Sequence, residues 1–263
     1  PGKVVLEIDH VSKSYDDKLI LKDVSLLVER GSKIAFVGQN GQGKTTLAKM
    51  IIGEIPYEGN IRLGHNVEIG YFAQNQAHYL DGELTLLDTM LNAANDSNRT
   101  KVRDILGAFL FRGDEVEKKV KVLSGGERNR LALAKMLLSS FNVLVMDEPT
   151  NHLDIASKNV LKQALQRFEG TLIIVSHDRD FLTGLTDKVY EFKNHTIKEY
   201  LGDIDFYLEQ RAVSSFREIE KGEEVKKEIV VEKEKALSYE EQKERKKLSN
   251  HLSKVERQIS DLE

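Results

Sequence analysis

The feature that most constrains the fold of this chain is the segment "GQNGQGKTT", residues 38–46. It follows "KIAFV", a short apolar run typical of a strand, and it leads into "LAKMII", which is typical of a helix. Glycines let the main chain adopt positive φ and approach a ligand closely. Successive N–H groups at the start of a helix then hold phosphate oxygens. The order of strand, glycine loop and helix therefore predicts a phosphate-binding loop of the G-x-x-x-x-G-K-[ST] type.

This loop also predicts individual roles. Lys44 is expected to bridge the β- and γ-phosphates of a nucleoside triphosphate, and the Thr45 hydroxyl is expected to ligate Mg²⁺. The predicted nucleotide-binding residues of the loop are Gly38, Asn40, Gly41, Gln42, Gly43, Lys44, Thr45 and Thr46. The expected ligands are therefore ATP and Mg²⁺.

A second segment, "VLVMDEPT" at residues 143–150, places two acids at the end of an apolar strand. In open α/β sheets, ligands bind at the carboxyl ends of the strands. Asp147 suits coordination of Mg²⁺, and Glu148, one residue further, suits polarising the attacking water. For Asp147 alone, a role as the cap of the next helix is the alternative.

The chain alternates apolar, β-branched runs with helical segments, which predicts a parallel sheet covered on both faces. Residues 4–8 and 24–28 are expected to be edge strands, and residues 59–64 and 67–74 are expected to pair as a hairpin. The other expected elements are helices at 44–53, 126–139 and 155–168, strands at 143–147 and 171–176, and a largely helical stretch at 83–120.

Residues 211–263 differ from the rest because they carry many charges and few large apolar side chains. At their end, Leu248, Leu252, Val255, Ile259 and Leu262 follow alternating four- and three-residue steps. This pattern predicts a charged linker at 211–247 and the start of a coiled coil at 248–263. A solvated amphipathic tail is the alternative.

Composition narrows the functional classes. The net charge of -4 gives no general reason to expect nucleic-acid binding, and the absence of cysteine excludes disulfides and cysteine-ligated zinc. We find no apolar run of 18 residues and no signal peptide, so we expect a cytoplasmic protein without membrane insertion. The chain begins at Pro1 rather than at an initiator Met, and it is expected to be part of a longer protein.

Five motifs occur in the order "GQNGQGKTT", "YFAQ", "LSGGE", "VLVMDEPTNHLD" and "IIVSHDRDFL". They resemble the Walker A, Q-loop, signature, Walker B with D-loop, and H-loop motifs of an ATP-binding-cassette (ABC) ATPase. The segments "LSGGERNRLALAKML", "DEPTNHLD" and "SHDRDFL" are similar to the motifs of the ABC-F subfamily, whose members carry two cassettes in one chain. The resemblance covers about residues 4–208.

The resemblance implies an α/β P-loop NTPase fold. Residues 1–210 would form an ABC-type nucleotide-binding domain with a helical subdomain at about 83–140 and an antiparallel β subdomain. A charged helical extension would follow it. The charged tail and the helical subdomain, which carries no obvious insertion, are similar to the second cassette of a Uup-type ABC-F protein.

The resemblance also implies site residues that the pattern alone does not. Tyr15 would stack on adenine, although a tyrosine of a surface turn is the alternative. Gln74 would reach Mg²⁺ and the attacking water from a flexible loop. His177 would contact the γ-phosphate and orient Glu148, so Glu148, His177 and Gln74 are the expected catalytic residues. The expected metal ligands are Thr45, Gln74 and Asp147.

The signature motif raises a separate expectation, because it begins a second helix whose N-terminus can hold an anion. The resemblance implies that Ser124, Gly125, Gly126 and Glu127 bind the γ-phosphate held by a partner cassette, in a head-to-tail pair. Asp154, in the D-loop, would cross to the same partner. The partner would be the other cassette of the full-length chain or, for the present chain, a second copy in a homodimer.

For the whole protein, the resemblance favours a translation factor that binds the ribosome and its RNA. A genome-maintenance ATPase that binds DNA through the C-terminal region is one alternative, and "KERKK" at 243–247 would suit either role. An ATPase subunit of a membrane transporter is another, and the "NHLD" and "HDRDFL" segments argue against it.

Overall fold

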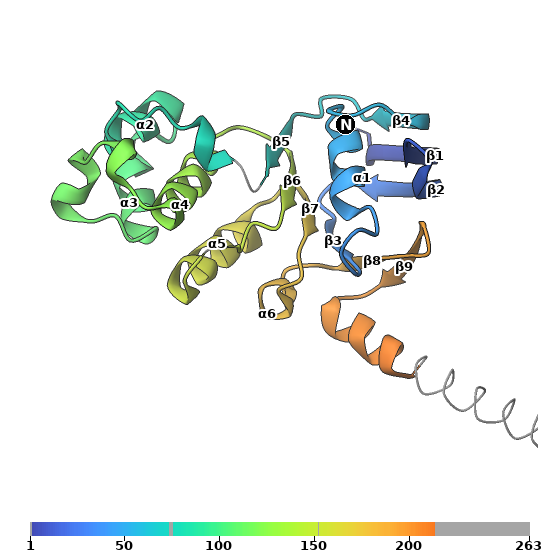
Figure 1. Ribbon diagram of the computed structural model, residues 1–263. Helices are drawn as coiled ribbons and strands as arrows, with labels where there is room; N and C mark the ends of the chain where they lie inside the picture. The colour runs from blue at the N-terminus through green and yellow to red at the C-terminus, as the bar shows by residue number, and fades with distance from the viewer. Residues whose placement is uncertain (1, 74–75, 152, 214–263) are drawn as a thin grey trace, which may run out of the picture. The chain divides into compact units, whose positions relative to one another are not determined.

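The computed structural model describes residues 2–73, 76–151 and 153–213 (Figure 1). Residues 2–207 belong to one compact unit, and residues 208–213, which are helical, belong to a second. The predicted linker and coiled coil lie outside the described residues, apart from 211–213. The predicted domain boundaries stay predictions. Among the described helices, none combines the length and the apolar character that a membrane span requires.

The larger sheet has six strands in the order β5-β6-β7-β3-β8-β9, and all neighbours are parallel except β8 and β9. Its central strands β6 and β7 are buried along their whole length, as expected for near-continuous apolar runs in a parallel sheet. The strands are β3 (Lys33–Val37), β5 (Ile69–Phe72), β6 (Val143–Asp147), β7 (Thr171–Val175), β8 (Lys188–Lys193) and β9 (Thr196–Leu201).

The register of this sheet brings the functional segments together. Val175 of β7 pairs with Phe36 of β3 on one side and with Asp147 of β6 on the other. The glycine loop after β3, Glu148 after β6 and His177 after β7 therefore leave the sheet at the same edge. Helices follow each of these strands: α1 (Lys44–Ile51), α5 (Ile155–Arg167) and α6 (Arg179–Leu182).

A second, antiparallel sheet has the order β2-β1-β4. Its strands are β1 (Val4–Tyr15), β2 (Lys18–Glu29) and β4 (Glu58–Leu63). The expected hairpin of residues 59–64 and 67–74 is wrong, because β4 pairs with β1 and β5 pairs with β6. β1 is also a central strand rather than an edge. Alternating apolar residues predict a strand but not its partner, and here the partners are distant in sequence.

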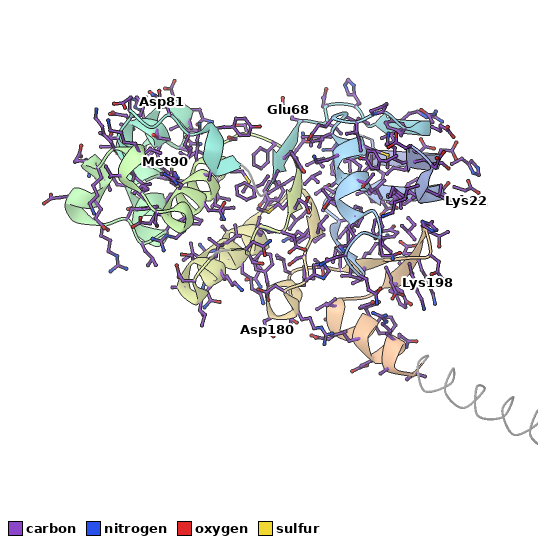
Figure 2. All side chains as sticks on the ribbon, viewed as in Figure 1. Lys22, Glu68, Asp81, Met90, Asp180 and Lys198 are labelled. Carbon is purple, nitrogen blue, oxygen red and sulfur yellow. The ribbon has the colours of Figure 1, made fainter. Side chains whose placement is uncertain are left out.

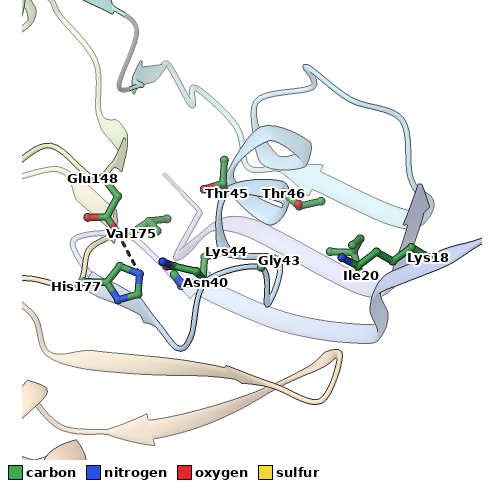
Figure 3. Close-up of a pocket in the computed structure, with 11 residues that line it drawn as sticks. Lys18, Ile20, Asn40, Gly43, Lys44, Thr45, Thr46, Glu148, Val175 and His177 are labelled. Carbon is green, nitrogen blue, oxygen red and sulfur yellow. Dashed lines mark ion pairs between the residues drawn. The ribbon is translucent and has the colours of Figure 1, made fainter. Parts of the chain in front are cut away.

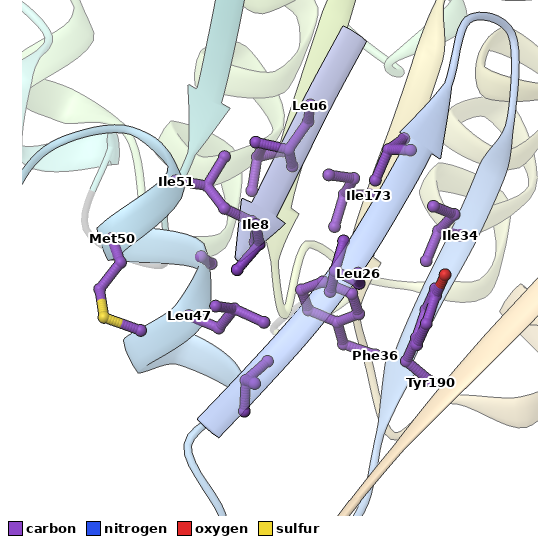
Figure 4. Packing of buried hydrophobic residues seen from close by; sticks show 14 of the residues in the cluster. Leu6, Ile8, Leu26, Ile34, Phe36, Leu47, Met50, Ile51, Ile173 and Tyr190 are labelled. Atoms are coloured by element: carbon purple, nitrogen blue, oxygen red, sulfur yellow. The ribbon is translucent and has the colours of Figure 1, made fainter. Parts of the chain in front are cut away.

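The main core lies where α1 and the antiparallel sheet meet the larger sheet (Figure 4). Leu47 of α1 and Val11 of β1 are fully buried there, as is Phe36 of β3. The ring of Phe36 lies 5.1 Å from that of Phe192 on β8, measured between ring centroids. This packing fixes α1, and hence the loop before it, against the carboxyl ends of the strands.

The expected helical subdomain is present and has a small core of its own. Met90 is fully buried among the side chains of this subdomain (Figure 2). Its helices are α2 (Leu86–Ala93), α3 (Val102–Ala108) and α4 (Gly125–Met136), which contact one another. Short 3₁₀ turns precede, join or follow them: η1 (Gln76–Tyr79), η2 (Arg99–Lys101), η3 (Gly113–Glu117) and η4 (Val120–Val122).

Candidate functional site

A cavity of about 260 Å³ opens where the glycine loop, β6 and β7 meet (Figure 3). We call it the nucleotide cavity. It is lined by residues of the glycine loop and α1, of the ends of β6 and β7, and of β2. These residues are Lys18, Ile20, Asn40, Gly41, Gly43, Lys44, Thr45, Thr46, Glu148, Val175 and His177.

The N-terminus of α1 faces this cavity without a side-chain cap. Gly43 stands at the cap position with φ of 95°, in the left-handed region that favours glycine. A Cβ added there would lie 2.8 Å from a methyl carbon of Leu21. The first turn of α1 also holds no acidic residue. The positive end of the helix is therefore open to an anionic ligand.

Lys44 is the buried cation of the site, with only 6% of its surface exposed. Its Nζ donates to the carbonyl oxygens of Gly38 at 2.7 Å and of Gln39 at 2.9 Å, which closes the loop on itself. Burial lowers the pKa of Lys44, while the nearby Glu148 and Asp147 carboxylates act in the opposite direction. The loop thus holds a desolvated ammonium group next to the cavity.

Thr45 and Asp147 bring two oxygen donors together, since the Thr45 hydroxyl donates to Asp147 Oδ1 at 3.1 Å. Asp147 is 8% exposed, and burial raises the pKa of its carboxyl above the usual value. Mg²⁺ prefers hard oxygen ligands, with one or two carboxylates completed by phosphate oxygens and water. The Thr45–Asp147 pair fits that donor set.

Glu148 and His177 form the second polar pair, drawn with a dashed line in Figure 3. His177 Nε2 lies 3.5 Å from Glu148 Oε1. Glu148 has φ of 49°, rare for a residue with a side chain, and its N–H donates to the Val175 carbonyl at 2.8 Å. Such main-chain strain is often found at functional sites.

The protonation states of this pair favour a base beside a neutral imidazole. Burial is the main cause that raises the pKa of Glu148, and a hydrogen bond from the His177 main chain partly offsets it. Partial burial and the charge of Lys44 lower the pKa of His177 below its usual value of 6.5, which favours the neutral ring at pH 7. A carboxylate with a raised pKa is a stronger proton acceptor than an exposed one.

Some residues predicted from the sequence are not part of this cavity lining. Tyr15 is 45% exposed at the end of β1, where its ring receives the Lys13 ammonium at 4.8 Å from the centroid. Gly38, Gln42 and Asp147 are also not in the lining. Gly38 instead meets β8: a Cβ there would lie 2.5 Å from the Phe192 carbonyl oxygen, and its φ is 139°. Gln74 lies outside the described residues.

Lys18 and Ile20 of β2 were not predicted, although both line the nucleotide cavity. The methyl Cγ2 of Ile20 would lie 3.0 Å from a Cβ built on Gly43, so β2 passes directly over the loop. The sequence carries no local signal for this contact, because it arises when the antiparallel sheet packs on α1.

The predicted signature residues lie elsewhere, at the N-terminus of α4. Ser124 caps this helix, since its hydroxyl accepts the Glu127 N–H at 3.3 Å. The Glu127 carboxylate accepts the Ser124 N–H at 2.7 Å, which completes a capping box. This hydrogen bond from the Ser124 main chain is the first cause that lowers the pKa of Glu127. Gly125 and Gly126 form the first residues of the helix.

Asp154 lies beside α4, at the cap of α5. Its Oδ1 accepts the Ser157 N–H at 2.9 Å, and its Oδ2 accepts from Arg130 Nη1 of α4 at 2.8 Å. The Ser157 hydrogen bond is the main cause that lowers the pKa of Asp154 to about 2. We call Ser124–Glu127 together with Asp154 the signature end. None of its residues lines the nucleotide cavity.

Comparisons with known proteins agree with this geometry. The family profile described as ABC transporter matches residues 21–151. A solved ATP-binding subunit of an ABC transporter has the same fold, with a TM-score of 0.68 at 21% identity; it covers 79% of this chain and 93% of its own. The predicted ABC-type α/β fold is thereby confirmed.

Sequence relatives specify the subfamily. ABC transporter F family member 5 of Arabidopsis thaliana is 42% identical across 85% of this chain and 33% of its own length. The ATP-binding protein Uup of Haemophilus influenzae is 41% identical across all of this chain and 43% of its own. The chain thus spans about a third to less than half of these relatives. It carries an ABC transporter-type ATP-binding domain and belongs to the ABC-F group of ATP-binding-cassette proteins.

Proposed function

We propose that this chain hydrolyses ATP to ADP and phosphate in the nucleotide cavity. ABC domains of this kind bind ATP, and the proposal extends that property to turnover. The observation that carries it is the Glu148–His177 pair, 3.5 Å apart beside the buried Lys44. An anion site alone would need Lys44 and the open helix N-terminus, but it would have no use for a desolvated carboxylate next to a phosphate.

In the proposed reaction, a water oxygen forms a bond to the γ-phosphorus while the bond from that phosphorus to the β–γ bridging oxygen breaks. Glu148 orients the water and accepts its proton, which its raised pKa favours. The neutral His177 has one N–H, which can orient Glu148 or turn to donate to the γ-phosphate. Lys44 and the N–H groups of the loop neutralise the charge on the phosphates.

Mg²⁺, when bound, supplies charge neutralisation at the β- and γ-phosphates. Thr45 and Asp147 are the described residues that would hold it. Asp147 does not line the cavity, so it would hold the ion together with the Thr45 hydroxyl or through a water molecule. Gln74 remains a proposed third ligand, and Tyr15 remains a proposed stacking partner for adenine.

We also propose that the signature end completes the site of another cassette. The N-terminus of α4 has the residues of an anion site, yet Ser124, Gly125, Gly126 and Glu127 are absent from the cavity that holds the glycine loop. A head-to-tail pair would place this end against the γ-phosphate of its partner, with Asp154 at the same interface. The partner is the other cassette of a longer chain or a second copy of this one.

For the longer protein, membership of the ABC-F group supports a role on the ribosome. DNA binding through the C-terminal residues is the competing outcome. Co-sedimentation of the full-length Glu148→Gln protein with ribosomes, and separately with a four-way DNA junction, distinguishes them. ATP-dependent association with ribosomes supports the first role, and association with the junction alone contradicts it.

The direct test of hydrolysis is Glu148→Gln in the present chain. We expect phosphate release to fall by about 10²–10⁴-fold, because a positioned general base contributes about that much. ATP affinity should stay within about twofold of the unsubstituted chain. Chelation of Mg²⁺ should abolish turnover in the unsubstituted chain. Equal turnover in both proteins would refute the assignment of Glu148.

Sedimentation of the Glu148→Gln protein with ATP and Mg²⁺ tests the pairing. A substitution that slows hydrolysis should trap the ATP-bound pair, so a concentration-dependent dimer is expected. Ser124→Arg, which places a bulky cation at the cap of α4, should prevent it. A monomer at high protein concentration in the presence of ATP would contradict homodimer formation.

A further inference from the structure

One face of α5 carries three polar side chains at four-residue spacing: Lys158, Lys162 and Gln166. Residues four apart lie above one another on a helix, so the three form a stripe. Each donates to the segment that follows His177. Lys158 Nζ reaches Asp178 Oδ2 at 2.6 Å, Lys162 Nζ reaches the Asp180 carbonyl at 2.6 Å, and Gln166 Nε2 reaches the Gly184 carbonyl at 3.3 Å. Asp180, next to α5, is labelled in Figure 2.

Asp178 links α5 to His177, because it binds Lys158 and directly follows His177 in the chain. Its Oδ1 accepts the Phe181 N–H at 3.1 Å, which caps α6, while its Oδ2 accepts from Lys158. Its own N–H donates to the Ser176 hydroxyl at 3.1 Å. Burial alone would raise the pKa of Asp178, but the hydrogen bonds from Lys158 and Phe181 keep it below its usual value. The carboxylate is thus charged and held from two directions.

The position of the His177 ring depends on how Asp178 is held. The ring is about half exposed, with 47% of its side chain accessible, so the cavity walls do not enclose it. The main chain before it is fixed by β7, which pairs with β3 and β6. The main chain after it is fixed by Asp178. Lys158 therefore secures the one side of His177 that the sheet does not.

We infer that Lys158 is a positioning residue for His177, acting through Asp178. This inference rests on the proposed ATP hydrolysis. Lys158 does not line the nucleotide cavity and is not a catalytic residue.

The kinetic test compares substitutions along the stripe. Lys158→Met should lower kcat by about 5- to 50-fold, because a small displacement of a catalytic group is enough for such losses. The KM for ATP should stay within about twofold. Lys158→Arg keeps the charge and should restore most of the rate. Lys162→Met is the matched control, since Lys162 binds a carbonyl further from His177, and its rate should stay within about twofold.

A double substitution separates positioning from general destabilisation. If Lys158 acts only through His177, Lys158→Met combined with His177→Ala should be no slower than His177→Ala alone. If adding Lys158→Met to His177→Ala lowers kcat by the same factor as Lys158→Met does alone, Lys158 acts by another route and the inference fails. The inference also fails if the Lys158→Met protein turns over ATP at the unsubstituted rate.

A readout that needs no turnover makes the two proposals separable. The ring resonances of His177 in the ATP-free chain can be assigned among the seven histidines with His177→Ala. We expect them to shift or broaden in Lys158→Met and to stay in place in Lys162→Met. A shifted His177 in a chain that hydrolyses no ATP would refute the proposed function and leave the positioning role standing. An unshifted His177 in Lys158→Met would overturn the inference.

Discussion

The nucleotide cavity and the signature end both contain a helix N-terminus suited to an anion. Side chains of the chain itself cap the helix only at the signature end. At the cavity, α1 begins at Gly43 without a side-chain cap, and burial raises the pKa of Asp147 and of Glu148. At the signature end, Ser124 and Glu127 cap α4. Hydrogen bonds there lower the pKa of Glu127, as they do that of Asp154.

This difference shows which site is arranged to receive a ligand. The acids of the cavity are desolvated beside Lys44, an arrangement that suits a cation, a phosphate and a water as further partners. The acids of the signature end already have partners within the chain. A ligand at the signature end must therefore displace or join existing hydrogen bonds, so we expect it to bind there only when a partner cassette brings it.

Lys44→Met should produce the largest effect on the cavity side. It removes a buried ammonium that bonds to two loop carbonyls, and losing such a group costs about 2–5 kcal/mol of binding. We expect the affinity for ATP, measured by calorimetry, to fall by at least about 30-fold. Lys49→Met is the control on the same helix, because Lys49 forms an exposed ion pair with Glu54. Equal losses in both variants would contradict the role of Lys44.

Asp147→Asn should stabilise the ATP-free chain, as expected for a functional group held in an unfavourable setting. The folded-state pKa of Asp147 is raised, so the folded state binds its proton more tightly than the unfolded state does. Stability is therefore lost as the pH rises above about 4, and asparagine avoids that loss. We expect an increase of about 1 kcal/mol, or about 2–4 °C in Tm, at pH 7.

That gain should shrink as the pH falls below about 4, where the unfolded state also takes up the proton. Thermal unfolding at pH 7 and at about pH 3 measures it. A Tm for Asp147→Asn that lies below that of the unsubstituted chain at pH 7 would show that the Thr45 hydrogen bond outweighs desolvation. The contrast between the two sets of acids would then fail.

The sequence predicts the cavity better than its surroundings, and the reason is physical. Lys44 and Thr45 are set by a strand, loop and helix that adjoin in sequence, and Asp147 ends a strand whose apolar character marks it as central. Lys18 and Ile20 reach the cavity only because β2 packs over α1. That contact depends on the pairing of β1 with both β2 and β4, which the alternation of apolar residues does not specify.

Conformation and partner choice are also hidden from the sequence. Nothing marks Glu148 as a residue with positive φ, since its position requires the carboxyl end of β6 and the carbonyl of Val175. The spacing of Lys158 and Lys162 is visible, but a stripe of lysines on a helix usually faces solvent. Only the fold places Asp178 within reach.

Glu127→Ala should have a moderate effect that is confined to the signature end. It breaks the capping box of α4, which we expect to lower the free energy of unfolding by about 0.5–1 kcal/mol. ATP affinity should stay within about twofold when measured at concentrations where the chain is monomeric, since Glu127 does not line the nucleotide cavity. A large loss of ATP affinity under these conditions would show that the two helix ends serve one site.

Asp154→Asn should have the smallest effect and the most specific pH dependence. Asparagine keeps a capping oxygen for α5 but loses the charge that binds Arg130. The pKa of Asp154 is lowered to about 2, so its charge contributes stability above the unfolded-state pKa of about 4 and loses it as the pH falls toward 2. The side chain is 43% exposed, and solvent screening limits the contribution to a few tenths of a kcal/mol, about 0.5 at most.

Urea unfolding at several pH values measures this contribution. We expect the free energy of unfolding of Asp154→Asn to be lower than that of the unsubstituted chain at pH 7. The two values should converge between pH 4 and pH 2. Asp96→Asn, on the exposed surface of the helical subdomain, is the control. A constant difference between the two curves down to pH 2 would mean that Asp154 acts through shape rather than charge, and the signature end would not be held by its own ion pair.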